Sequence, residues 1–153
     1  IHVHVYKGAT FWGVDPDFIG KKGGTTTVLD AGSTGSQNYR GFKDWIVDNA
    51  SIRVLGLMHL SEIGLVSYKG ELNDPAFADL AGGVSAIRDM PETFIGCKIR
   101  LSGLPGSQAE FMDPVWPCSM WDGRFIPNQK SQTSVIIVYS WVGFRFYSVA
   151  NHL

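Results

Sequence analysis

Cysteine is scarce in this chain, which has only Cys97 and Cys118 among 153 residues. Two cysteines do not make the disulfide framework that holds small secreted domains together, so we expect a reducing compartment, the cytoplasm. An excess of charge of one sign is also absent, because 13 Lys and Arg residues stand against 14 Asp and Glu residues without a polybasic run. The net charge of −1 argues against nucleic acid or an anionic membrane as the main partner.

Long hydrophobic runs and the common nucleotide and nucleophile motifs are lacking too. The most apolar stretch, Ser134 to Ala150, is short and carries Arg145, so it predicts no membrane span. There is no P-loop, no G-x-S-x-G, no G-x-G-x-x-G and no Cys pair at zinc spacing. With 44% hydrophobic residues, the chain has the composition and the length of one globular domain.

Strand and helix patterns alternate over the first two thirds of the chain. Apolar or β-branched runs of strand length occupy residues 1–5, 25–29, 52–57 and 93–99. Helices are predicted to follow Asp15-Pro16, Asn38 and Asn73-Asp74-Pro75, where capping residues and prolines begin the pattern. The resulting order predicts an α/β fold with parallel strands, either a small open sheet or about four units of a (β/α)8 TIM-type barrel.

Two of these helices have an apolar face that predicts packing against the sheet. In the second helix, Phe42, Trp45 and Ile46 recur at i, i+3 and i+4. In the third helix, the apolar positions on one face are Phe77, Leu80, Val84 and Ile87.

The character of the chain changes after Ser102. Residues 104–128 contain four prolines and show no period, and no acidic residue follows Asp122. Residues 134–149 predict one long strand or a hairpin that turns near Gly143. We therefore predict a half barrel over 1–102 and an irregular, β-rich C-terminal tail over 103–153. A frameshift, a read-through intron or a misjoined assembly is our hypothesis for this divergence. Because the chain starts at Ile1 inside a strand, we also expect a fragment of a longer protein.

His2 and His4 lie two residues apart in the first predicted strand, so both imidazoles project from one face. Two neutral imidazoles side by side form half of a site for zinc or a similar divalent metal. The structural alternative is a pair of strand histidines that face water.

Lys98 lies near the end of an apolar strand, between Cys97 and Ile99. Burial of an ammonium group is unfavourable unless the group is paired or its pKa falls. A neutral amine can form a Schiff base, or it can add carbon dioxide to become a carbamate that bridges two metal ions about 3.5–4 Å apart. The alternative is that Lys98 extends to the strand end or pairs with an acid.

Asp30 and His59 follow the second and third predicted strands, at the edge where α/β proteins bind ligands. Asp30 binds metal or substrate, or caps the turn Ala31–Ser33. His59 is a metal ligand, a substrate contact or a core residue. We take both as candidate substrate-binding residues.

Together these residues resemble the amidohydrolase superfamily of dihydroorotase-like metal-dependent hydrolases, and within it the deacetylase branch. His2–Tyr6 and the loop that follows are similar to the family's H-x-H strand. Gly24–Ser33 resembles its G-x-T-T-x-x-D-A-G-S segment, and Ile95–Arg100 resembles the V-G-I-K-x-R strand that carries a carboxylated lysine. The match runs in order from residue 1 to about 102.

The resemblance implies a (β/α)8 barrel with one or two divalent metals, usually zinc, which polarise an amide carbonyl and lower the pKa of a bridging water towards 7. His2 and His4 would hold the more buried metal. Lys98, as a carbamate derived from carbon dioxide, would bridge to the second metal. The substrate would be a small-molecule amide or cyclic amide, hydrolysed at a non-peptide C–N bond.

Two later histidines and a proton-shuttle aspartate of the family have no counterpart after Ser102, so we assign no catalytic residue in this chain. The family often has Asn where this chain has His59. We expect a fragment of a metal-dependent amidohydrolase that is inactive in isolation. The alternative is a non-catalytic half barrel that self-associates or binds a partner. A third reading, an enzyme that forms a Schiff base at Lys98, leaves His2 and His4 unexplained.

Overall fold

The computed structural model describes residues 2–67, 70–72, 74–99, 134–139 and 145–150. Strands and helices alternate as far as residue 98, which confirms the predicted order. The elements are β1 (His2–Val3), α1 (Pro16–Gly23), β2 (Thr27–Asp30), α2 (Tyr39–Phe42), the π-helix η1 (Lys43–Val47), β3 (Arg53–His59), the 3₁₀-helix η2 (Pro75–Phe77), α3 (Leu80–Asp89), β4 (Phe94–Lys98), β5 (Ser134–Tyr139) and β6 (Arg145–Ala150).

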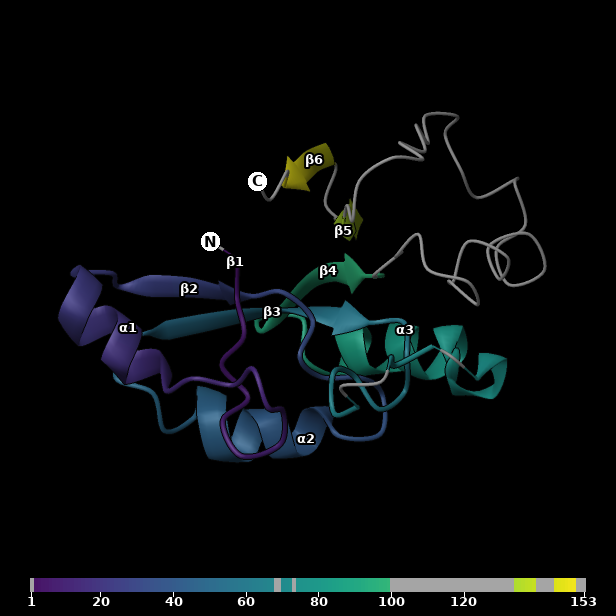
Figure 1. Cartoon of the computed structure of the whole chain (residues 1–153), viewed down its shortest axis with the longest axis horizontal. Helices are drawn as coiled ribbons and strands as arrows, with labels where there is room; N and C mark the ends of the chain where they lie inside the picture. Colours follow the sequence, from purple (N-terminus) through teal and green to yellow (C-terminus); the bar gives the residue numbers. More distant parts are fainter. Residues whose placement is uncertain (1, 68–69, 73, 100–133, 140–144, 151–153) are drawn as a thin grey trace.

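The first four strands form one parallel sheet in the order β1-β2-β3-β4, and α2 and α3 lie on the same side of it (Figure 1). This arrangement confirms the α/β class and agrees with a partial barrel. β5 and β6 pair antiparallel in a separate sheet, which agrees with the hairpin, one of the two predicted alternatives, and not with one long strand. Gly143 and the predicted boundary between residues 102 and 103 lie outside the described residues.

The main hydrophobic core lies between the sheet and the helices. Phe42 is fully buried. Its ring meets Tyr6 edge-on and Phe94 at a tilt of 31°, with ring-centroid distances of 5.3 and 6.1 Å. Other buried members of this cluster are Val5, Val28, Ile46, Val54, Met58, Ala86 and Met90. Each large side chain removed from water here contributes about 1.5–3 kcal/mol, which holds the helices on the sheet.

α1 begins and ends as the capping residues predict. The Asp15 side chain accepts a hydrogen bond from the backbone N–H of Asp17 at 2.9 Å, and Pro16 occupies the first turn, where its missing N–H costs nothing. Gly24 ends the helix with φ of 64°, a left-handed conformation that favours glycine.

The predicted position of Trp45 in the apolar face is wrong. Phe42 and Ile46 are buried, but the Trp45 side chain is 76% exposed. The helix continues as the π-helix η1, in which the Asp48 N–H donates to the carbonyl of Lys43 five residues earlier. This wider turn changes the angular position of each side chain and leaves Trp45 outside the core.

The third helix starts later than predicted. Asp74 caps only the short η2, whereas Asp79 caps α3 by accepting a hydrogen bond from the Gly82 N–H at 2.8 Å. Phe77 therefore precedes the helix, and it packs on a small second cluster around Leu60. The chain stays extended between η2 and α3 because Ala78 bridges to a loop residue after β3.

A register shift between β3 and β4 determines which way Lys98 points. Gly56 lies opposite Phe94, but Leu57 lies opposite Gly96, so β4 contains one extra residue. Phe94 packs in the core beside the helices. After the shift Lys98 pairs with His59, on the other face of the sheet.

Candidate metal centre

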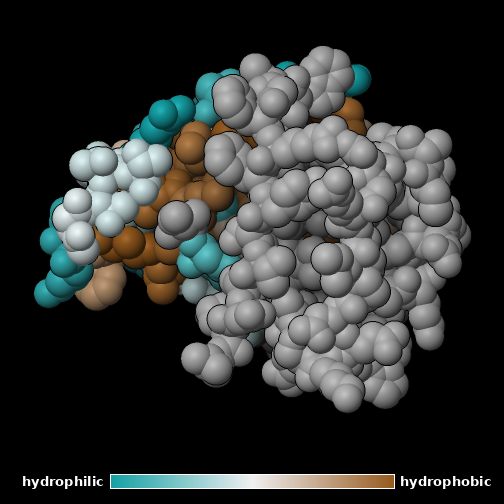
Figure 2. Space-filling view, turned by 90° about the horizontal axis from the view of Figure 1, so that it is seen from above, coloured by the Kyte–Doolittle hydropathy of each residue, from teal (hydrophilic) through white to brown (hydrophobic). Residues whose placement is uncertain are grey.

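The sheet face opposite α2 and α3 collects four of the predicted site residues. Val3 and Met58 pack with the helix-side core, so their strand neighbours project from the other face. Figure 2 views the molecule from this side, and in its coloured part hydrophobic residues lie next to hydrophilic ones. The residues brought to this face by strand alternation and register are His2, His4, His59 and Lys98.

His2 and His4 form the pair that the sequence predicts. Their Nε2 atoms lie 3.3 Å apart, and the rings meet edge-on with centroids 5.2 Å apart. A tetrahedral zinc ion at about 2.0–2.1 Å from each of two nitrogens separates them by about 3.3–3.4 Å. The two imidazoles therefore fit one edge of a zinc site.

Ser33 connects the histidine pair to a buried carboxylate. His4 Nδ1 lies 3.0 Å from Ser33 Oγ, and Ser33 Oγ lies 2.7 Å from Asp30 Oδ2. Ser33 and Asp30 are both fully buried. A hydrogen bond at Nδ1 orients the ring and leaves Nε2 for a metal, as is usual for metal-binding histidines. Sequence reasoning missed Ser33, although it stands within the G-x-T-T-x-x-D-A-G-S segment.

Asp30 accepts hydrogen bonds at both carboxylate oxygens. Oδ1 accepts from the Ser33 N–H at 2.6 Å, and Oδ2 accepts from the Val5 N–H at 2.7 Å as well as from the Ser33 hydroxyl. Burial raises the pKa of Asp30, while these hydrogen bonds and the charge of Lys98 act in the opposite direction. The geometry favours the cap of the turn Ala31–Ser33, and a role of Asp30 in substrate binding stays a prediction.

Lys98 is only 2% exposed, and its Nζ donates a hydrogen bond to the Ala31 carbonyl at 2.7 Å. It thus reaches from β4 to the end of β2, next to the residues that contact His4. Gly32 makes this approach feasible, because a Cβ atom there would lie 2.5 Å from Lys98 Cγ, and its φ is 87°. A carbamate on Lys98 stays a prediction.

His59 is paired with an acid that sequence reasoning missed. His59 and Glu71 are both buried, and His59 Nε2 lies 3.2 Å from Glu71 Oε1. His59 Nδ1 accepts a hydrogen bond from the Ser61 N–H at 2.9 Å, so in the neutral ring the proton is on Nε2, the nitrogen that lies near the Glu71 carboxylate. This geometry favours the reading of His59 as a core residue. No pattern around Glu71 indicated the pair.

Cys97 is a free thiol, and burial raises its pKa to about 11. It is therefore protonated at neutral pH and unsuited to act as a nucleophile. Over the parts of the chain that the structure describes, no three His, Cys, Asp or Glu side chains converge as a metal site, and no helix is long and apolar enough to cross a membrane.

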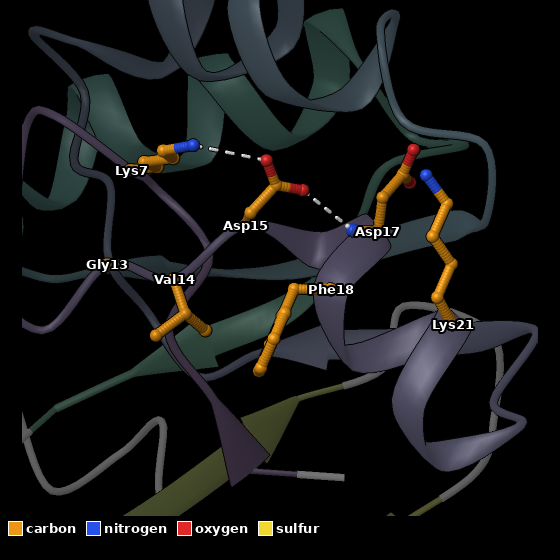
Figure 3. Close-up of a pocket in the computed structure, with 7 residues that line it drawn as sticks. All are labelled: Lys7, Gly13, Val14, Asp15, Asp17, Phe18 and Lys21. Carbon is orange, nitrogen blue, oxygen red and sulfur yellow. Dashed lines mark hydrogen bonds and ion pairs between the residues drawn. The ribbon is translucent and has the colours of Figure 1, made fainter.

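A shallow pocket lies at the loop after β1 and the start of α1 (Figure 3). Lys7 Nζ lies 3.2 Å from Asp15 Oδ2 at one side, and the exposed side chains of Val14 and Phe18 lie at the other. None of the predicted site residues lines this pocket, so it is separate from the histidine pair.

No family model matches the chain. A deacetylase of Agrobacterium fabrum is 34% identical over 104 residues, which are 67% of this chain and 26% of the relative. A deacetylase of Enterococcus faecalis is 37% identical over 101 residues, 66% of this chain and 27% of the relative. The chain thus spans about a quarter of the length of the curated relatives that it matches.

Two solved structures match the same share of the chain. The crystal structure of an adenine deaminase has a TM-score of 0.62 and 37% identity, and covers 66% of this chain and 27% of that one. The crystal structure of a dihydroorotase has a TM-score of 0.63 and 34% identity, and covers 66% and 28%. At these values the likeness extends to both fold and sequence.

Proposed function

The N-terminal two thirds of this chain is homologous to members of the amidohydrolase superfamily, and on this basis we propose that it carries the first metal ligands of a metal-dependent amidohydrolase. The reaction is the hydrolysis of a non-peptide C–N bond in a small-molecule amide or cyclic amide. The isolated chain is inactive, because the later ligands and the proton-shuttle aspartate of the family have no counterpart in its sequence.

One observation carries the metal assignment: the Nε2 atoms of His2 and His4 are 3.3 Å apart, the spacing of two ligands on one tetrahedral ion. Bound zinc would polarise the amide carbonyl and lower the pKa of a water molecule towards 7. His2 and His4 would hold the ion by Nε2. Lys98, desolvated at the end of β4, would supply two more oxygen atoms once carbon dioxide had converted it to a carbamate.

Zinc titration of the whole chain against a chromophoric chelator tests the histidine ligands. We expect one site of measurable affinity in the parent chain and its loss in both His2→Ala and His4→Ala. His152→Ala is the matched control, because it removes an imidazole that is distant from β1 in the sequence, and it should bind zinc like the parent. Unchanged affinity in His4→Ala would refute the assignment.

The carbamate on Lys98 has a separate test. Carbon-13 NMR of the zinc-loaded chain in labelled bicarbonate should show a carbamate signal, which disappears in Lys98→Ala. Lys7→Ala, which removes an exposed lysine, should keep the signal. Absence of the signal in the parent chain would leave His2 and His4 as the metal ligands and remove Lys98 from the set.

The second candidate function is a non-catalytic half barrel that self-associates or binds a partner. Exposed aromatic side chains favour it, since Phe11, Trp12 and Phe18 are 59%, 46% and 60% exposed. Sedimentation velocity together with metal analysis separates the two functions. A self-associating chain without zinc affinity supports the half barrel, and a zinc-binding monomer supports the amidohydrolase. A cytoplasmic location stays a prediction in both cases.

A further inference from the structure

We propose that Ser33 and Asp30 are positioning residues that hold the His4 imidazole with its proton on Nδ1, so that the Nε2 lone pair faces the metal side of the histidine pair. The importance of this tautomer for zinc rests on the proposed function. The tautomer itself is a property of the metal-free chain and can be measured there.

The direction of the hydrogen bonds starts from Asp30. The backbone N–H groups of Val5 and Ser33 donate to its two oxygens at 2.7 and 2.6 Å, and a backbone N–H can only donate. Both oxygens are thus acceptors inside a fully buried site. With Asp30 ionised, as these donors and the charge of Lys98 favour, the Ser33 hydroxyl, 2.7 Å from Oδ2, donates its proton to the carboxylate.

The hydroxyl has one proton, so its interaction with His4 runs the other way. Ser33 Oγ must accept from His4 Nδ1, which lies 3.0 Å away. Neutral histidine in water favours the opposite form, with the proton on Nε2, in which the nitrogen that faces His2 could not bind a metal. The Asp30–Ser33 pair reverses this preference.

The backbone holds the two positioning residues in place. Asp30 is the last residue of β2, and the Ala31 N–H donates to the Val3 carbonyl at 2.8 Å, which ties the loop to β1 between the two histidines. Gly32, with φ of 87°, turns the chain so that the Ser33 hydroxyl lies next to His4 Nδ1. The arrangement is therefore formed before any metal binds, which is how such partners raise metal affinity.

Long-range proton–nitrogen NMR of the metal-free chain, labelled with nitrogen-15 at histidine, reads the tautomer directly. We expect the His4 signals to show the proton on Nδ1 at a pH where the ring is neutral. Signals that place the proton on Nε2 would overturn the proposal. The measurement uses the parent chain alone, so it does not depend on the folding of a variant.

Variants then test the cause. Ser33→Ala should return His4 to the Nε2–H form and weaken zinc binding about 10- to 100-fold. Ser61→Ala is the matched control, since it removes an equally buried hydroxyl that donates elsewhere, to the Glu71 carbonyl. It should change neither the tautomer nor the zinc affinity. Ser33→Thr keeps the hydroxyl and should restore the Nδ1–H form.

Failure of this inference is distinguishable from failure of the proposed function. A parent chain with the Nδ1–H tautomer but without zinc affinity would refute the metal function and support the positioning role. A parent chain that binds zinc with the Nε2–H tautomer, or a Ser33→Ala variant that keeps both tautomer and affinity, would overturn the positioning role alone.

Discussion

The two faces of the parallel sheet are built on different principles. The face beside α2 and α3 contacts an apolar core in which Phe42, Phe94 and Met58 are almost completely buried. The opposite face carries His2, His4, His59 and Lys98, and the buried groups there are held by hydrogen bonds or an acid–base contact. Apolar packing thus stabilises one face. On the other face, the burial of polar groups lowers the free energy of unfolding, which is typical of functional sites.

The largest effect is expected on the helix side of the sheet. Phe42→Ala removes a fully buried ring that contacts Tyr6 and Phe94, and it should lower the free energy of unfolding by about 3–5 kcal/mol. Trp45→Ala, three residues away at a 76% exposed position, should change it by no more than about 0.5 kcal/mol. Urea denaturation of both variants measures the difference.

Equal losses in the two variants would show that the helix side is not the packed face. The comparison sharpens if zinc affinity is also measured below the urea transition. Folded Phe42→Ala should bind zinc like the parent, because His2 and His4 lie on the other side of the sheet.

A smaller effect on stability is expected at the sheet face opposite α2 and α3, where Gly32 lets Lys98 approach the loop after β2. Gly32→Ala strains a residue with φ of 87° and also places Cβ 2.5 Å from Lys98 Cγ. Gly24→Ala is the matched control, because its φ of 64° is also left-handed, but no atom lies within 4 Å of the added Cβ. Gly24→Ala should cost about 1–2 kcal/mol from the backbone alone. Gly32→Ala should exceed it by about 1–3 kcal/mol from overpacking.

Thermal and urea unfolding of the two glycine variants give this difference. If the free energy of unfolding falls equally in both variants, Lys98 moves aside without strain. The close contact between Gly32 and Lys98 would then not affect stability.

The smallest effect is expected at an exposed site that belongs to neither face. Hydrogen bonds from the Ser51 hydroxyl and N–H, both at 2.7 Å, lower the pKa of Asp17 below its ordinary value. A carboxylate with a lowered pKa adds stability above the pKa of the unfolded chain, and this is lost as the pH falls. Ser51→Ala should raise the pKa of Asp17 and flatten that loss, which NMR titration of the carboxyl carbon measures.

Asp15 is the internal control in the same titration, because Lys7 causes the lowering of its pKa. Its pKa should not change in Ser51→Ala and should rise in Lys7→Ala. A shift of Asp15 in place of Asp17 would contradict the assignment of partners.

Local signals predicted much of the fold because their causes are local. Asp15, Pro16 and Gly24 bound α1 through contacts with their own neighbours, and the strand-length apolar runs became β2, β3 and β4. The extent of the helical faces was harder to predict. Trp45 fits an α-helical period, but the π-helix changes the turn. Asp74 is the predicted cap of the third helix, whereas it caps only η2 and Asp79 caps α3.

By itself, the sequence determined that His2 and His4 share a face, because alternation along a strand is a property of the backbone. Only the tertiary structure decided that Lys98 joins them, since a bulge in β4 relative to β3 reverses the alternation after Phe94. It also decided the partners, bringing Glu71 to His59 and Ser33 to His4. These contacts join residues far apart in the chain, and they depend on how strands and loops pack against one another, which no local pattern of residues encodes.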